Sequence, residues 1–122
     1  MALLSISCSV IGSDEQDLGD NYYYLPEYEA IDVGFTDGPI IYKSKEKYLF
    51  SDIKLRGNIN KVEHDDSFIL VSKISEDSLG QRRQLLYYII IKATDSLSGP
   101  FDEEQYLERR NRFKIPKNLV LD

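Results

Sequence analysis

The side chains best suited to chemistry lie in one short run, Glu63-His64-Asp65-Asp66, which contains the single histidine of the chain. An imidazole beside several carboxylates is a set of groups that can bind a cation. Metal sites, however, usually draw their ligands from separated segments, and the sequence offers no second cluster to complete this one. Asp, Asp and Ser are also typical turn residues. We therefore predict a polar hairpin turn here, with no metal and no cofactor.

Nucleophilic catalysis would need a second reactive group beside the imidazole. A cysteine or serine nucleophile depends on a positioned base, and an exposed turn is a poor place to hold His64 in that geometry. The sequence contains no phosphate-binding loop, dinucleotide-binding glycine pattern, HExxH motif or CxxC motif. The sequence contains 21 acids, so some of their carboxylates would lie close together in any fold. A close carboxylate pair is therefore weak evidence for catalysis, and a carboxylate-dependent hydrolase is only a minor alternative. We expect that the protein is not an enzyme.

The single cysteine, Cys8, lies in an N-terminal stretch that is similar to the end of a bacterial lipoprotein signal. In Leu4-Ser5-Ile6-Ser7-Cys8, small residues precede a cysteine that would become lipidated, and residues 12–20 are polar and acidic, like a tether. The alternative is a short first strand that buries Cys8 as a small apolar side chain. We expect residues 1–20 to be this lipobox-like segment with its acidic tether, and residues 21–122 to form a single domain.

Charge is distributed unevenly along the chain. The net charge is −6, yet the first basic residue is Lys43, and the 42 residues before it contain eight acids. The remaining residues carry thirteen acids and fifteen bases. Because an acidic N-terminal third repels nucleic acid, we expect a basic protein as the partner and no nucleic acid.

The segment Asn21–Glu29 interleaves four tyrosines with acids inside this acidic region. Tyrosine is favoured at protein interfaces because it offers a large contact area at a low entropic cost. The alternative is an edge strand whose tyrosines pack on a sheet, and the alternation of side chains along a strand allows both. We predict that the partner-binding residues are the tyrosines and acids of this region: Tyr22, Tyr23, Tyr24, Glu27, Tyr28, Glu29, Asp32 and Asp37.

Hydrophobic periodicity predicts antiparallel strands. Residues 31–35 alternate between apolar and small or polar positions, and Asp37-Gly38 predicts a hairpin to a returning strand at 40–43. The next strand should contain a bulge near 58–60, where the alternation changes phase. The runs 68–74 and 85–91 are apolar on both faces and are predicted to be central strands.

One helix is well defined near the C-terminus. Asp102 and Gln105 have the spacing of a capping box, Phe101 and Tyr106 have that of a hydrophobic staple, and arginines follow in the last turn. Tyr106, Leu107 and Phe113 should face the sheet. The predicted fold is α+β, an antiparallel β-meander of about five to six strands with one C-terminal helix packed on a face.

The layout resembles small bacterial lipoproteins whose function is not established, and immunity proteins encoded beside secreted bacterial toxins. The resemblance rests on Ala30–Lys43, Leu85–Lys92, the turn Thr94–Phe101 and the ending Glu104–Arg110 with Ile115-Pro116. It covers roughly residues 21–121 and carries over no functional residue.

The resemblance implies a non-catalytic protein-binding module of the bacterial cell envelope, periplasmic or surface-exposed and lipid-anchored at Cys8. As an immunity protein it would bind and neutralise a basic toxin domain through its acidic, tyrosine-rich third. The alternative is a structural or assembly lipoprotein without a toxin partner. The oligomeric state does not follow from the sequence.

Overall fold

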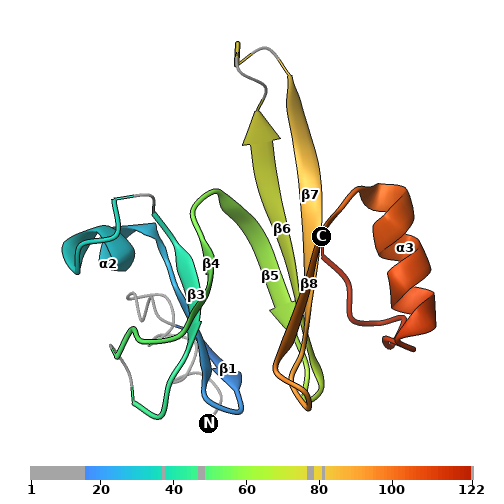
Figure 1. Ribbon diagram of the computed structural model, residues 1–122, viewed down its shortest axis with the longest axis horizontal. Helices are drawn as coiled ribbons and strands as arrows, with labels where there is room; N and C mark the ends of the chain where they lie inside the picture. The colour runs from blue at the N-terminus through green and yellow to red at the C-terminus, as the bar shows by residue number, and fades with distance from the viewer. Residues whose placement is uncertain (1–15, 37, 47–48, 77–78, 81, 122) are drawn as a thin grey trace, which may run out of the picture. The chain divides into compact units, whose positions relative to one another are not determined.

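The computed structural model describes residues 16–36, 38–46, 49–76, 79–80 and 82–121. These residues form two compact units that meet in the sequence between Arg56 and Gly57. Each unit contains a four-stranded antiparallel sheet (Figure 1). The α+β class and the antiparallel pairing are confirmed. The described residues contain eight strands, however, where five or six were predicted.

The first unit is a meander in which each strand pairs with the next in the sequence. Its sheet has the order β1-β2-β3-β4, and a short helix lies between the second and third strands. The elements are β1 (Gln16–Gly19), β2 (Tyr22–Leu25), α2 (Glu27–Asp32), β3 (Ile40–Lys43) and β4 (Ile53–Arg56). Strand β2 therefore lies inside the sheet and is not the edge strand that the sequence suggested.

Apolar and aromatic side chains on one side of this sheet form the core beneath α2. Ala30 of the helix is fully buried with Leu25, Ile40 and Tyr42. Aromatic rings extend this core, because the Tyr42 and Phe50 rings meet edge to face with centroids 4.9 Å apart. Such edge-to-face contacts stabilise a core beyond the area they bury.

Two sequence predictions in this unit are wrong. Residues 31–35 do not form a strand, because α2 occupies 27–32 and the chain then turns toward β3. The alternation there marks no buried face, since Ile31 and Val33 are exposed and only Phe35 is half-buried. Residues 16–19 of the predicted tether form β1, and Leu18 in this strand is fully buried.

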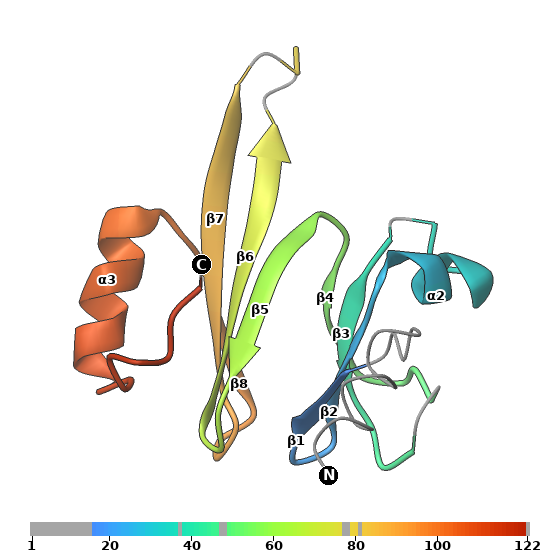
Figure 2. The ribbon, with the colours of Figure 1, turned by 180° about the vertical axis from the view of Figure 1, so that it is seen from behind.

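The second unit is a second meander with a helix on one face. Its sheet has the order β5-β6-β7-β8, formed by β5 (Ile59–His64), β6 (Phe68–Glu76), β7 (Arg83–Ile91) and β8 (Ser96–Phe101) (Figure 2). Both predicted central strands are confirmed and are longer than the apolar runs. The bulged strand predicted after residues 40–43 is divided at Gly57 into β4 and β5, which lie in different sheets. The register of β5 against β6 does shift between Ile59 and Lys61, at the place where the bulge was predicted.

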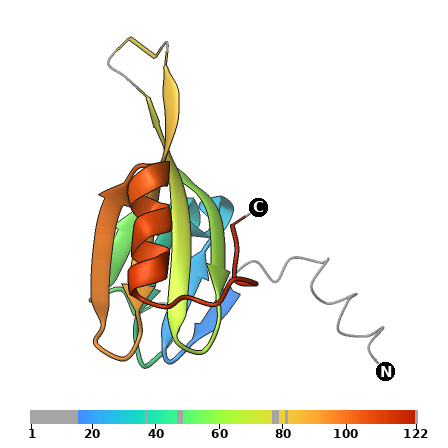
Figure 3. The ribbon, with the colours of Figure 1, turned by 90° about the vertical axis from the view of Figure 1, so that its right-hand side faces the viewer.

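The C-terminal helix α3 (Glu103–Arg112) begins where the sequence predicted. The Asp102 carboxylate accepts a hydrogen bond from the Gln105 backbone N–H at 2.8 Å, and the Gln105 side chain accepts one from the Asp102 N–H at 3.0 Å. This capping box satisfies two N–H groups that the first turn of a helix leaves unpaired. Figure 3 shows α3 lying over the face of the β5–β8 sheet.

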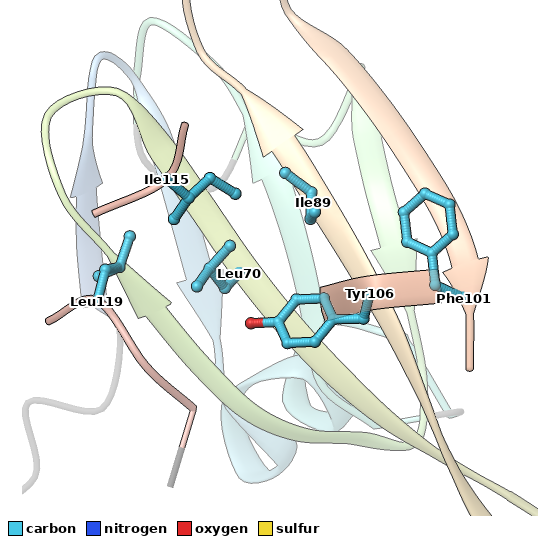
Figure 4. Close-up of a cluster of buried hydrophobic side chains, with 6 residues drawn as sticks. All are labelled: Leu70, Ile89, Phe101, Tyr106, Ile115 and Leu119. Carbon is cyan, nitrogen blue, oxygen red and sulfur yellow. The ribbon is translucent and has the colours of Figure 1, made fainter. Parts of the chain in front are cut away.

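A cluster of buried side chains holds α3 and the C-terminal segment on this sheet (Figure 4). Tyr106 reaches from the helix toward the strands, and Ile115 and Leu119 of the last segment complete the cluster. Leu70 and Ile89 of the sheet are fully buried beneath them. Among the described residues, no helix has the length and apolar character required to cross a bilayer.

Candidate functional site

Helix α2 presents large apolar side chains to solvent. Tyr28 is 84% exposed, Ile31 46% and Val33 43%, on a segment only a few residues long. Glu27 and Asp32 are exposed beside them. Tyr28, Ile31 and Asp32 lie three and four residues apart, so a helix places them on one face. We call Glu27, Tyr28, Ile31, Asp32 and Val33 the α2 surface.

The local sequence explains why a helix forms at this point. Pro26 takes an extended backbone conformation before the first helical residue, and Glu27 and Glu29 lie in the first turn, where negative charge is favourable. The helix ends where Gly34 adopts a φ of +108°, and the Phe35 N–H then bonds to the Ala30 carbonyl at 2.8 Å. The core thus fixes the helix through Ala30 and leaves its other face open.

The tyrosines that precede the helix are mostly structural. Tyr22 is fully buried, so it cannot be the partner-binding residue that the sequence suggested. Tyr23 is half-buried, and its ring stacks on that of Tyr42 with centroids 5.3 Å apart. Tyr24 is also half-buried, and Glu29 is partly covered. Of the residues proposed for binding, Glu27, Tyr28 and Asp32 are exposed, and Asp37 lies outside the described residues.

Tyr24 has a perturbed pKa. Burial raises the pKa of its hydroxyl above the ordinary value, and the negative charge of Glu27 raises it further. Because the folded state holds this proton more tightly than the unfolded state does, the associated stability is complete below about pH 10. It is lost as the pH rises through the raised pKa.

We therefore expect the free energy of unfolding to fall as the pH rises above about 10, and Tyr24→Phe to make this fall shallower. Urea denaturation at a series of alkaline pH values measures how steeply the free energy of unfolding falls with pH in the wild type and in the variant. Equal slopes for the wild type and the variant would show that Tyr24 does not link folding to pH.

The run around the histidine forms a turn, as predicted. His64 is the last residue of β5, and the Asp65 carboxylate accepts hydrogen bonds from the N–H groups of Ser67 and Phe68, each at 2.8 Å. The Lys92 ammonium donates to the Asp65 carbonyl at 2.7 Å. Within the described ranges, no three metal-binding side chains come together. Cys8 and the lipobox-like segment lie outside those ranges.

The second unit contains two concave surfaces that the sequence did not indicate. One, of about 640 Å³, is polar and lies along β5, β6 and β7 beside Asn60, Lys73 and Tyr88. The other, of about 380 Å³, lies between α3 and the C-terminal segment. We call this second one the α3 groove; its lining includes Tyr87, Tyr106, Leu107, Arg110, Lys117 and Val120.

Leu107 was predicted to face the sheet, and the structure corrects this. Its side chain is 54% exposed, and it lines the α3 groove together with the exposed Val120. Only Tyr106 of the helix is buried, because a short helix lying on a sheet covers one narrow stripe. Leu107 directly follows Tyr106, and adjacent residues of a helix do not face the same side. An apolar residue at this position was the one signal in the sequence for the groove.

Comparison with known proteins identifies a family for this chain. A protein-family model described as a protein of unknown function (DUF3997) matches residues 20–122, which is most of the chain. No curated protein and no solved structure matches the chain.

Proposed function

The chain belongs to the DUF3997 family, and we propose that it is a non-catalytic protein-binding module of the bacterial cell envelope. In this proposal it acts as an immunity-type inhibitor, and the α2 surface binds a basic protein such as a toxin domain. The observation that carries the proposal is the 84% exposure of Tyr28 on a helix that also exposes the acids Glu27 and Asp32. Tyrosines in such positions act as anchors at protein interfaces.

The electrostatic character of α2 supports a basic partner. Its first turn carries Glu27 and Glu29, Asp32 ends it, and its last turn holds no base. Opposite charge on the partner would speed the encounter, while the apolar side chains would provide contact area once the complex has formed. Two bases of this unit lie over aromatic rings, Lys43 over Tyr22 at 5.0 Å and Arg56 over Phe35 at 5.2 Å.

The cell-envelope part of the proposal is supported by the sequence around Cys8 alone. A lipidated cysteine would anchor the protein to a membrane surface without a spanning helix, usually together with a second membrane-binding signal. Mass spectrometry of the protein isolated from its native membrane tests this part, because acylation adds the mass of the lipid to the Cys8 peptide. An unmodified Cys8 in the native protein would remove this part and leave partner binding to be judged separately.

Tyr28→Ala is expected to abolish capture of the partner. Truncating an interface anchor typically costs at least about 2 kcal/mol, or roughly 30-fold in affinity. The purified protein is immobilised, exposed to extracts and secreted proteins of its native organism, and the bound proteins are identified by mass spectrometry.

Glu46→Lys is the matched control for the acidic part of the same surface, because Glu46 is exposed in the same unit but lies outside α2. The proposal predicts that a basic protein binds the wild type and the Glu46→Lys variant, and that Tyr28→Ala and Asp32→Lys lose it. A captured protein that all four forms retain equally would rule out the α2 surface.

A further inference from the structure

The same chain carries two exposed surfaces of complementary chemistry. The α2 surface combines apolar side chains with carboxylates, and the α3 groove combines apolar side chains with two cations, Arg110 and Lys117. We infer that the α2 surface of one copy docks into the α3 groove of a second copy. This inference rests on the proposed function, because it uses the same α2 surface and names one basic partner for it.

Two stacked aromatic rings form part of the groove lining. The rings of Tyr87 and Tyr106 stack with centroids 4.4 Å apart and an angle of 11° between their planes. Leu107 and Val120 are 54% and 42% exposed in the lining. These side chains offer apolar contact area that a docked Tyr28 or Ile31 would cover.

The position of Arg110 is fixed by its own contacts. One guanidinium nitrogen donates to the Tyr106 hydroxyl at 3.2 Å, and the other donates to the Pro116 carbonyl at 2.9 Å. A guanidinium has five N–H donors, and these bonds engage two of them. A charged donor held in place loses little entropy when it binds a carboxylate, which favours a charge-assisted pair with Asp32 or Glu27 of another copy.

Among the described residues that line the groove, one is an acid, Glu103, in the first turn of α3. It precedes Arg110 by seven residues, about two helical turns or roughly 10 Å along the axis. The positive charge of the groove is therefore concentrated toward the C-terminal end of α3. The carboxylate of Asp32 should dock at this end, beside Arg110 and Lys117.

A contact of this kind joins two different surfaces, so each docked copy still presents one unoccupied surface of each kind. A single short helix in a small groove buries little area, and such interfaces are weak. We therefore expect reversible self-association that increases with protein concentration and decreases with salt.

Sedimentation equilibrium of the 122-residue chain at low salt tests the inference. The weight-average mass of the wild type should rise with concentration above the 14.1 kDa of one copy. It should return toward that value at 1 M NaCl, where the Debye length is about 3 Å. A wild-type mass that is independent of concentration overturns the inference.

Two charge reversals then identify the surfaces. Asp32→Lys and Lys117→Glu should each abolish self-association, whereas the matched reversals Glu46→Lys and Lys61→Glu, at exposed positions outside both surfaces, should not. An equimolar mixture of Asp32→Lys with Lys117→Glu should associate again. In the mixture an intact α2 surface meets an intact groove, and the two reversed charges also attract each other.

The mixture separates a surface effect from misfolding, because an unfolded variant cannot restore association. Persistent self-association of either single variant, or no recovery in the mixture, overturns the inference.

The experiments also distinguish failure of this inference from failure of the proposed function. Capture of a foreign basic protein without self-association supports only the proposed function, and self-association without such capture supports only the inference.

Discussion

Replacing Tyr106 with alanine is expected to lower the free energy of unfolding by about 3–5 kcal/mol. Tyr106 is 6% exposed, and it is the only residue of α3 buried in the described structure. Its removal leaves a cavity against Tyr87 and deprives Arg110 of a hydrogen-bond acceptor. A loss of this size is a large part of the roughly 5–15 kcal/mol that stabilises a typical domain.

Urea denaturation followed by circular dichroism measures this loss, and Tyr106→Phe is the matched control. Phenylalanine keeps the ring stacked on Tyr87 and removes only the hydroxyl that accepts from Arg110. Its expected cost is about 1 kcal/mol. If the alanine variant were no less stable than the phenylalanine variant, Tyr106 would not be the side chain that holds α3 on the sheet.

Gly99→Ala is expected to destabilise the second unit by about 2–4 kcal/mol, from backbone strain and overpacking together. Gly99 has a φ of +129° in β8, next to the point where the register of β7 and β8 shifts. A Cβ atom there would lie 2.7 Å from the Tyr87 carbonyl oxygen and 3.2 Å from the Tyr88 Cα. Both are backbone atoms of the neighbouring strand, so relief requires the strands to move apart.

Gly34→Ala separates the two contributions. Gly34 also has a positive φ, +108°, but a Cβ there meets no atom within 4 Å. Its substitution should therefore cost only the backbone strain, and the difference between the two alanine variants should report the steric clash in β8. Equal losses in thermal or urea denaturation would show that strands β7 and β8 accommodate the added methyl group.

The second unit could be predicted largely from its sequence because local signals and tertiary packing agree there. The capping box at Asp102, the bulge between Ile59 and Lys61 and the apolar runs of β6 and β7 all describe structure that is formed. The turn after His64 follows the same rule, since Asp65 satisfies nearby backbone N–H groups with its own carboxylate.

The first unit was predicted less well because its pattern fits two structures. Ile31, Val33 and Phe35 alternate as a strand does, while Pro26 and the acids after it favour a helix start. The helix buries Ala30 against Leu25, Ile40 and Tyr42, which lie on the two strands that flank it in the sequence. That pairing could not be read from the local pattern.

The candidate site was predicted in part for a related reason. The sequence placed the acids and tyrosines in one region, but exposure depends on which strand lies inside the sheet. Because β2 pairs with both β1 and β3, Tyr22 is buried and Tyr23 packs on Tyr42. The helix that follows then leaves Tyr28 and Asp32 in solvent.

The most direct test of the central claim is the association rate of the captured basic partner with the wild type and with Asp32→Lys, measured by surface plasmon resonance at increasing salt. For the wild type, the rate constant should fall steeply with ionic strength, because attraction between opposite charges accelerates the encounter. For Asp32→Lys it should be lower at low salt and depend less on salt, whereas Glu46→Lys should behave more like the wild type. Identical salt dependence for the wild type and Asp32→Lys would contradict a basic partner at the α2 surface.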